Sequence, residues 1–295
     1  MLLVVLLMVM VSSLVVVVIV LLLMPLVCHS IVSKDDIIDS SSSVSLVITS
    51  CDRTEFLGSL LLSMFTHNKY KFNEVIIAEA SGKNDVLNGL KSTYPFLTYL
   101  VSERLSQVVN IDIAYDHVKK SNSNGNGNGN VKYILHFEED WIILRGGFIE
   151  KSISLLELNR NISVVSLHAP QPGDWFRQID PCCNFSSIGG YMKIDTDLGW
   201  GYFTWGAGLR RLQDYIDIGG NYRQYNHTWK TNAQLQNEAK GLGIYVKKNY
   251  IHREWKVNWL YKDRHMRVAL INDTVPYARH VGAKTIDQRG YSPFE

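Results

Sequence analysis

The chain has 295 residues, of which 46% are hydrophobic and 20% charged, and its formal net charge is +2. This composition is typical of a globular protein with room for one large or two small domains. No basic stripe stands out, which argues against a nucleic-acid-binding protein, so we expect no nucleic acid among its partners.

The N-terminus is the one compositional anomaly, because residues 2–27 contain no charged side chain. As a helix this run would extend roughly 39 Å, more than a hydrocarbon core of about 30 Å. A cleavable signal peptide usually has a shorter apolar region and a basic start. We therefore expect residues 1–27 to form a signal anchor, a transmembrane helix, followed by a short stem over 28–43. Cleavage near Cys28 is the alternative.

Either outcome directs the chain into the secretory pathway and places its body in a lumen, in the Golgi or the endoplasmic reticulum. Four N-x-Ser/Thr sequons, at Asn161, Asn184, Asn226 and Asn272, fit a luminal glycoprotein. The four cysteines are Cys28, Cys51, Cys182 and Cys183, and they have neither zinc-type spacing nor the density of a disulfide framework. A disulfide from Cys182 or Cys183 to Cys51 stays open.

The body begins with a β-branched apolar run, Val44–Ser50, which predicts a buried strand. A helix follows, with apolar residues at helical spacing from Leu57 to Phe65, and Asp52 three residues before Glu55 suits a capping arrangement. Further strands are predicted over Glu74–Ala80 and Phe96–Ser102. The next helix has Val108, Ile111, Tyr115 and Val118 on one face.

The Gly/Asn-rich stretch Ser121–Asn130 predicts a surface loop, since it cannot bury a core. A fourth strand is predicted over Lys132–Phe137, a helix over about Phe148–Asn159 and a fifth strand over Ile162–His168. Continuous apolar strands that alternate with helices predict a mainly parallel, doubly wound α/β sheet.

The C-terminal half has weaker signals. Residues 199–220 predict a Gly- and aromatic-rich loop that leads into an amphipathic helix, and residues 232–243 predict another helix. Residues 243–252 are strand-like, and the polar tail from Arg279 is predicted to be irregular.

Polar residues occur at the ends of three of the predicted strands, at 49–53, 79–82 and 138–141. In parallel sheets ligands bind beyond the carboxyl ends of the strands, so we expect these segments to meet. The last one contains Glu138, Glu139 and Asp140, whose like charges raise one another's pKa unless a cation neutralises them. A lone acidic triplet is more often a solvated turn, but this placement favours a site for Mg²⁺ or Mn²⁺.

The ordered motifs SLVITSCDRTEFLGSLLLSMFTHN, EVIIAEASG, SQVVNIDIAYDHV and YILHFEEDW with GGFIEKSISLL resemble nucleotide-sugar glycosyltransferases of the GT-A fold. The resemblance covers about Val44 to His168, with weaker echoes in GLRRLQDYIDIG and RHVGAK. It is closest to family 2, and within it to members with an E-D-D-W type metal motif. It implies a Rossmann-like sheet flanked by helices.

The resemblance also implies roles for single residues. Thr49, Cys51 and Arg53 would border the nucleotide base, and Glu79 would lie near the base or ribose. Each has a structural alternative, since Glu79 could cap the turn after its strand and Arg53 could be a surface residue in the first turn of a helix.

The implied metal ligands are Glu138 and Asp140, with His280 matching a late histidine that contacts metal or diphosphate in some relatives. The cation would bridge to the donor diphosphate and neutralise the leaving group. Glu139 departs from the family pattern, because it replaces the more usual central Asp. The stretch FTWGAGL lacks the Asn-Pro found in that region of relatives.

An inverting transferase needs a carboxylate base for the acceptor hydroxyl. Glu238 is our candidate, and Asp214 and Asp197 compete with it. Three tryptophans, Trp141, Trp200 and Trp205, could form an acceptor-side platform for a sugar ring, and core packing explains such aromatics equally well.

Together these expectations describe a single GT-A domain over 44–295, with a donor-binding half at 44–168 and an acceptor-side half at 169–295. It would transfer a hexosyl or related sugar from a nucleotide-diphosphate donor to a glycan or protein, with Mn²⁺ or Mg²⁺ and with inversion. The alternative is an inactive GT-A relative that acts as a luminal carbohydrate-binding or scaffold protein. A nucleotidyltransferase would carry a Gly-rich pyrophosphate loop after the first strand, which SCDRTEFLG does not supply.

Overall fold

The structure is a computed structural model, and it divides the chain into two compact units, residues 1–36 and 37–295. It describes residues 32–103, 107–123, 130–167, 185–188, 191–194, 203–204, 206–223, 257, 260–261, 264–271 and 276–282, with backbone alone for 185–188 and 191–194. The apolar run over 1–27 lies outside these residues. Within the described part of the chain, no helix is both long enough and apolar enough to cross a membrane.

The strands are β1 (Val44–Ser50), β2 (Val75–Glu79), β3 (Thr98–Val101), β4 (Tyr133–Glu138), β5 (Trp141–Ile143), β6 (Ile162–Ser166), β7 (Phe185–Ile188), β8 (Tyr191–Ile194), β9 (Gly208–Arg211), β10 (Arg267–Ile271) and β11 (Ala278–His280). The helices are α2 (Lys34–Ile37), α3 (Thr54–His67), α4 (Asn88–Thr93), α5 (Gln107–Ser123), α6 (Phe148–Leu158) and α8 (Leu212–Asp217), with a 3₁₀ turn at Asp85–Leu87. The predicted helices of the first half are therefore confirmed.

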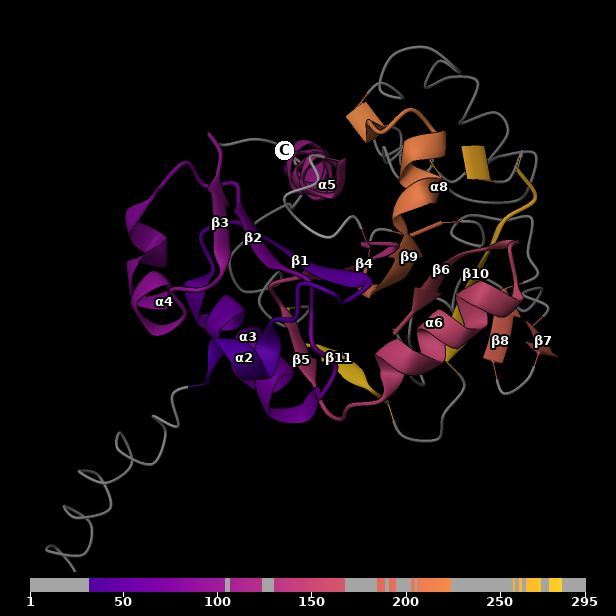
Figure 1. The fold of residues 1–295 in the computed structure, drawn as a ribbon, viewed down its shortest axis with the longest axis horizontal. Coiled ribbons are helices and arrows are strands. Elements are labelled where there is room, and N and C mark those ends of the chain that lie inside the picture. The colour runs from indigo at the N-terminus through magenta and orange to yellow at the C-terminus, as the bar shows by residue number, and fades with distance from the viewer. Residues whose placement is uncertain are drawn as a thin grey trace, which may run out of the picture. The chain divides into compact units, whose positions relative to one another are not determined.

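One large sheet forms the centre of the main unit, in the order β3-β2-β1-β4-β9-β6-β10-β8-β7. Only β9 and β8 pair antiparallel with both of their neighbours, so the other strands share one direction. Every residue of β1, β2 and β6 is buried, because helices cover both faces. Figure 1 shows α3 and α6 on one face and α5 and α8 on the other. The predicted α/β class with a mainly parallel sheet is confirmed.

The main unit begins before Val44. Ile37 is buried, and its carbonyl accepts a hydrogen bond from the N–H of Phe72 at 2.8 Å. Ile38 forms a parallel bridge with Phe72. The residues from Ile37 on therefore belong to the packed body, inside the segment predicted as a stem.

Three local predictions are wrong. Asp52 does not cap the first helix: α3 starts after Arg53, and the Asp52 backbone has a φ of 57°. Gly208–Arg211 is a strand in the middle of the sheet and not part of a loop, and its buried arginines hide the apolar pattern that predicts strands. Ala278–His280 is a strand in the tail predicted as irregular, since three residues are too few for a periodic signal.

Glycine is required at the start of β9. A Cβ on Gly208 would lie 2.6 Å from the carbonyl oxygen of Val165 on β6, well inside the closest real contact. The bare backbone lets β9 insert between β4 and β6. Arg211 at the other end of β9 is buried and donates to the carbonyls of Leu156, Asn159 and Ile162. It thereby satisfies backbone acceptors at the end of α6.

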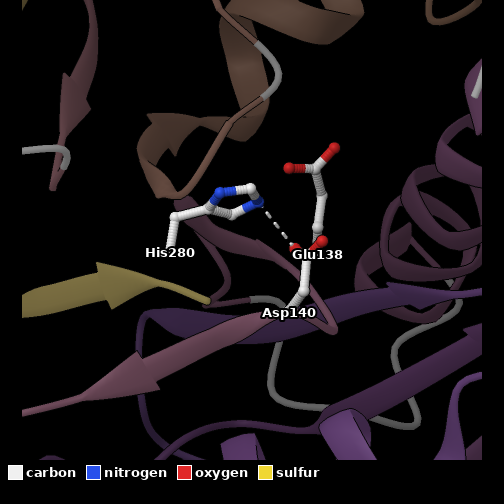
Figure 2. Close-up of side chains that lie close together, drawn as sticks. All are labelled: Glu138, Asp140 and His280. Carbon is white, nitrogen blue, oxygen red and sulfur yellow. Dashed lines mark ion pairs between the residues drawn. The ribbon is translucent and has the colours of Figure 1, made fainter. Parts of the chain in front are cut away.

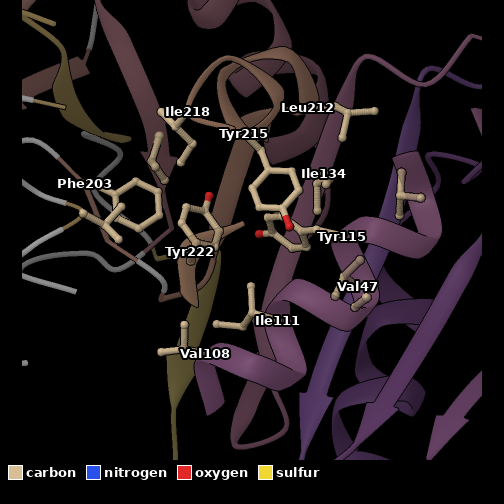
Figure 3. Packing of buried hydrophobic residues seen from close by; sticks show 14 of the residues in the cluster. Val47, Val108, Ile111, Tyr115, Ile134, Phe203, Leu212, Tyr215, Ile218 and Tyr222 are labelled. Atoms are coloured by element: carbon tan, nitrogen blue, oxygen red, sulfur yellow. The ribbon is translucent and has the colours of Figure 1, made fainter. Parts of the chain in front are cut away.

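A hydrophobic cluster joins α5 to the C-terminal half on one face of the sheet (Figure 3). Tyr115 of α5 packs edge-on against Tyr215 of α8, with ring centroids 5.1 Å apart, and Tyr222 packs on Tyr215 at 4.9 Å. Phe203 contacts Tyr222 at 5.6 Å. Such aromatic pairs contribute beyond the area they bury.

A buried carboxylate lies beside this cluster. Asp112 of α5 has none of its surface exposed, and it accepts hydrogen bonds from the Tyr215 hydroxyl and from the N–H of Tyr222. It also accepts from the N–H and the Nε of Arg223. Burial raises the pKa of Asp112, although these bonds act in the opposite direction. Asp112, in the first half of the sequence, therefore binds the segment that follows α8.

Replacing Asp112 with alanine leaves the buried N–H of Tyr222 without its acceptor, whereas the N–H of Arg223 keeps the Oδ1 of Asn221. An unsatisfied buried donor costs about 1–3 kcal/mol, so we expect the free energy of unfolding to fall by about 3 kcal/mol in urea titrations. Asp116→Ala on the same helix is the matched control, because Asp116 pairs with Lys119 at 3.6 Å and otherwise meets the Tyr215 hydroxyl only at 3.5 Å. We expect it to cost less than about 1 kcal/mol. Equal losses in the two variants would contradict the role of Asp112.

Candidate metal and donor site

The ends of β1, β2 and β4 meet at one edge of the sheet, as the sequence predicts. In the parallel register Ser50 lies opposite Glu79, and Thr49 lies opposite Glu138. The segments that follow these strands are therefore neighbours. Parallel strands pointing the same way bring their carboxyl ends, and the polar residues after them, to a common edge.

The acidic triplet spans the end of β4 and a tight turn. Glu138 is the last residue of β4, Glu139 and Asp140 form the turn, and β5 starts at Trp141. The position of β5 is held from α3, where the Ser63 hydroxyl accepts a hydrogen bond from the N–H of Ile143 at 3.0 Å. The two strands that flank the turn, β4 and β5, are therefore both held in place.

The distant strand β11 completes the group. It pairs antiparallel with β5, with His280 opposite Trp141. The N–H of Val281 donates to the carbonyl of Asp140 at 2.8 Å. Figure 2 shows the imidazole of His280 directed toward the carboxylates of Glu138 and Asp140, and the ligand atoms of the three side chains lie within 4.8 Å of one another.

These three side chains suit a divalent cation. Carboxylate oxygens are the preferred ligands of Mg²⁺ and Mn²⁺, and imidazole is a common ligand of transition metals. Asp140 is only 5% exposed, and its Oδ1 lies 3.1 Å from the Nε2 of His280. Buried carboxylates need a positive partner. A donor set of two carboxylates and one imidazole would hold Mn²⁺ and leave positions for other oxygen ligands.

Arg53 supplies a positive charge to the triplet. Its Nε lies 2.6 Å from Oε1 of Glu139, and its Nη1 lies 3.0 Å from Oδ2 of Asp140. Burial would raise the pKa of Asp140, but the hydrogen bond and charge of His280, with those of Arg53, outweigh it and lower this pKa. Burial lowers the pKa of His280, and Asp140 and Glu138 reverse this to a net increase. Asp140 is therefore held as an anion between the guanidinium of Arg53 and the imidazole of His280.

The ionised forms of Glu138 and Glu139 are stabilised less than that of Asp140. Burial, and then the charge of Asp140, raises the pKa of Glu138, which accepts a hydrogen bond from the Gln107 amide at the start of α5. Burial raises the pKa of Glu139 to about 7, and the charge of Arg53 only partly offsets it. A cation bound at this edge would favour the ionised forms of both carboxylates.

The predicted base-side residues lie at the same edge, in different roles. Glu79 is buried, and its Oε1 accepts from the N–H of Asp52 at 3.0 Å and from that of Ser81 at 2.9 Å. It therefore joins the loops after β1 and β2, a wider function than the turn cap considered from the sequence. Cys51 is exposed at this edge.

Thr49 is buried, and its hydroxyl lies 3.2 Å from Nε2 of His136 in the middle of β4. The other ring nitrogen of His136 lies 3.0 Å from the hydroxyl of Tyr115. Burial, and then the charge of Arg210, holds the pKa of His136 well below its usual value, so this ring is neutral. Thr49 thus contributes to a buried polar network beneath the site.

Trp141 is buried beside His280 at the candidate site. It is 4% exposed, with its ring centroid 5.2 Å from that of His280 and 6.3 Å from that of Phe137. The position of Trp141 fits the core-packing alternative, because a ring that is so little exposed does not offer an open surface for a sugar ring. The candidate base Glu238, its competitor Asp197, and Trp200 and Trp205 lie outside the described residues. Asp214 is engaged with Arg211 at 3.2 Å.

Sequence reasoning missed two contributors, Gln107 and Gly282. A Cβ on Gly282 would lie 2.1 Å from Oδ2 of Asp140, so only glycine lets this segment close over the carboxylate. Its position two residues after His280 in RHVG is the one signal in the sequence. Gln107 had no signal, since its role depends on where α5 begins relative to β4.

Comparisons with known proteins gave structural neighbours alone, because no family model and no curated protein matches the chain. S. aureus TarS in complex with UDP-GlcNAc has 11% identity and a TM-score of 0.48, covering 82% of this chain and 61% of that one. The mannosyltransferase PcManGT from Pyrobaculum calidifontis, in complex with GDP-Man and Mn²⁺, has 11% identity and a TM-score of 0.44, covering 86% and 63%.

The glycosyltransferase GlyE of Streptococcus pneumoniae has 11% identity and a TM-score of 0.41, covering 78% of this chain and 45% of that one. The chain matches less than two thirds of the length of each of these three proteins. At such similarities the function has to be inferred from this chain's own residues.

Gly282→Ala tests how closely β11 and its following residues cover the carboxylate. The new methyl group would displace the side chain of Asp140, so we expect Mn²⁺ affinity to fall about 10-fold or more, as when other groups that orient a ligand are altered. Titration followed by the EPR signal of free Mn²⁺ measures this. Gly89→Ala is the matched control, because a Cβ there has nothing within 4 Å. An unchanged affinity in Gly282→Ala would contradict the close approach.

Proposed function

We propose that the chain is a metal-dependent glycosyltransferase of the GT-A type, which moves a sugar from a nucleotide-diphosphate donor to a glycan or protein acceptor. One observation carries the proposal. Glu138, Asp140 and His280 converge at the carboxyl edge of the parallel strands, with their ligand atoms within 4.8 Å of one another.

This placement suits a phosphorylated ligand. In open α/β sheets, ligands bind beyond the carboxyl ends of the strands. A cation held there would supply Lewis-acid stabilisation for the negative charge that develops on a leaving diphosphate. The resemblance of the sequence motifs points to a nucleotide sugar as the donor, with Mn²⁺ or Mg²⁺ as the cation.

In this proposal, the residues of the site have separate roles. Glu138, Asp140 and His280 hold the cation. Glu79 keeps the loops after β1 and β2 together through the N–H groups of Asp52 and Ser81, and these loops border the place that the resemblance assigns to the base and ribose. The buried Trp141 supports the ring of His280 from behind.

Further parts of the proposal rest on the sequence. They are membership of family 2 with its E-D-D-W type motif, an inverting outcome with Glu238 as the base, and a membrane anchor over residues 1–27. A luminal location in the Golgi or endoplasmic reticulum belongs with that anchor.

The decisive experiment screens the purified full-length protein against UDP- and GDP-sugars with Mn²⁺, measuring donor hydrolysis and transfer to glycan acceptors. We expect Asp140→Asn and Glu138→Gln to lose at least about 100-fold in rate, because the lost cation is worth several kcal/mol of transition-state stabilisation. Glu150→Gln in the first turn of α6 is the matched control and should keep full activity. Chelation of the metal should abolish activity in the wild-type protein.

Two outcomes would decide against this function. Activity that persists unchanged in Asp140→Asn would show that the triplet is not the metal site. Metal-dependent binding of UDP or GDP, without hydrolysis or transfer of any sugar, would favour the inactive relative that binds carbohydrate or acts as a scaffold.

A further inference from the structure

Arg53 makes the most unusual contact in the site. It is the residue that precedes α3, and its guanidinium reaches across to the turn after β4. There it bridges two consecutive carboxylates, through Nε to Glu139 at 2.6 Å and through Nη1 to Asp140 at 3.0 Å. The Arg53 side chain is 31% exposed, whereas those of Glu139 and Asp140 are 5% and 7% exposed.

The two oxygens of Asp140 are thereby divided between two partners. Oδ2 faces Nη1 of Arg53, and Oδ1 faces Nε2 of His280 at 3.1 Å. Glu139 has its Oε1 on Arg53, whereas the three ligand atoms that come within 4.8 Å of one another belong to Glu138, Asp140 and His280. Glu139 stands outside that group although it lies between two of its members in the sequence.

We propose that Arg53 is a positioning residue of the metal site: it withdraws Glu139 from the ligand set and fixes Asp140 so that Oδ1 alone is presented to the cation. This inference rests on the proposed metal-dependent function. It also gives a role to Glu139, the residue at which the triplet departs from the family pattern.

The chemistry of the guanidinium supports this role. Its planar fork presents several N–H donors in fixed directions, so one group can bridge two carboxylates in a defined geometry. An ammonium group keeps the charge but is a point donor on a flexible stem. Arg53 also offsets part of the negative charge of the triplet, through its contacts with Glu139 and Asp140.

The test measures Mn²⁺ affinity of the full-length protein by EPR, with thermal unfolding in EDTA to check that each variant folds. Glu139→Gln keeps an oxygen acceptor for Arg53, so we expect a loss of no more than about 5-fold. Asp140→Asn removes a ligand and should lose at least about 100-fold. Arg53→Lys keeps the positive charge but loses the planar guanidinium, and Glu139→Leu removes the carboxylate that holds the guanidinium. We expect the Mn²⁺ affinity of each variant to fall about 10-fold or more, the usual effect of altering a group that orients a ligand.

The double variant Arg53→Lys/Glu139→Leu should bind Mn²⁺ about as well as Arg53→Lys alone, because Glu139 acts on the site only through its contact with Arg53. Lys83→Met is the matched control for loss of a nearby positive charge, since Lys83 pairs with Asp52 at 2.6 Å in an exposed ion pair. We expect its Mn²⁺ affinity to equal that of the wild-type protein.

Three results would overturn the inference. A loss in Glu139→Gln as large as that in Asp140→Asn would make Glu139 a ligand. Wild-type affinity in both Arg53→Lys and Glu139→Leu would remove the positioning role and leave the metal site intact. No Mn²⁺ binding by the wild-type protein would overturn the metal site and the role of Arg53 together. If Glu139→Leu does not fold, Glu139→Gln and Arg53→Lys decide.

Discussion

The site depends on a concentration of negative charge that the chain could not bury without positive partners. Three carboxylates follow one another at the end of β4, and Glu139 and Asp140 are almost fully covered. Removing such charges from water is costly unless a counter-charge comes with them. Arg53, just before α3, supplies a counter-charge 2.6 Å from Glu139, and the imidazole of His280 on β11 lies 3.1 Å from Asp140. The geometry of the acidic turn follows from this requirement.

Two separate features of the fold bring Arg53 and His280 to the acidic turn. The parallel register of β1 and β4 carries the loop after β1, and with it Arg53, to the same edge as the acidic turn. The small sheet of β5 and β11 brings His280 back from near the C-terminus. Gly282 lets that returning segment approach the Asp140 carboxylate at a distance no side chain would permit.

A second buried carboxylate has a different task. Asp112 on α5 accepts one hydrogen bond from Tyr215 of α8 and three from the two residues Tyr222 and Arg223 after it, next to the aromatic cluster around Tyr115. The two halves of the main unit are therefore joined on the face of the sheet that also carries the buried ring of His136. Asp112 maintains the fold, whereas the acidic turn at the carboxyl end of β4 forms the candidate metal site.

The sequence by itself determined the α/β class, the strands of the first half and the edge at which polar residues would gather. These features are local, because apolar runs and helical spacing are written into consecutive residues. Tertiary structure alone decided that β9 enters the centre of the sheet and that β11 forms at all. It also decided that Glu139 pairs with Arg53 while Glu138 and Asp140 face His280. Each of these depends on contacts between segments far apart in the chain, and short strands and ion pairs leave no periodic signal in the sequence.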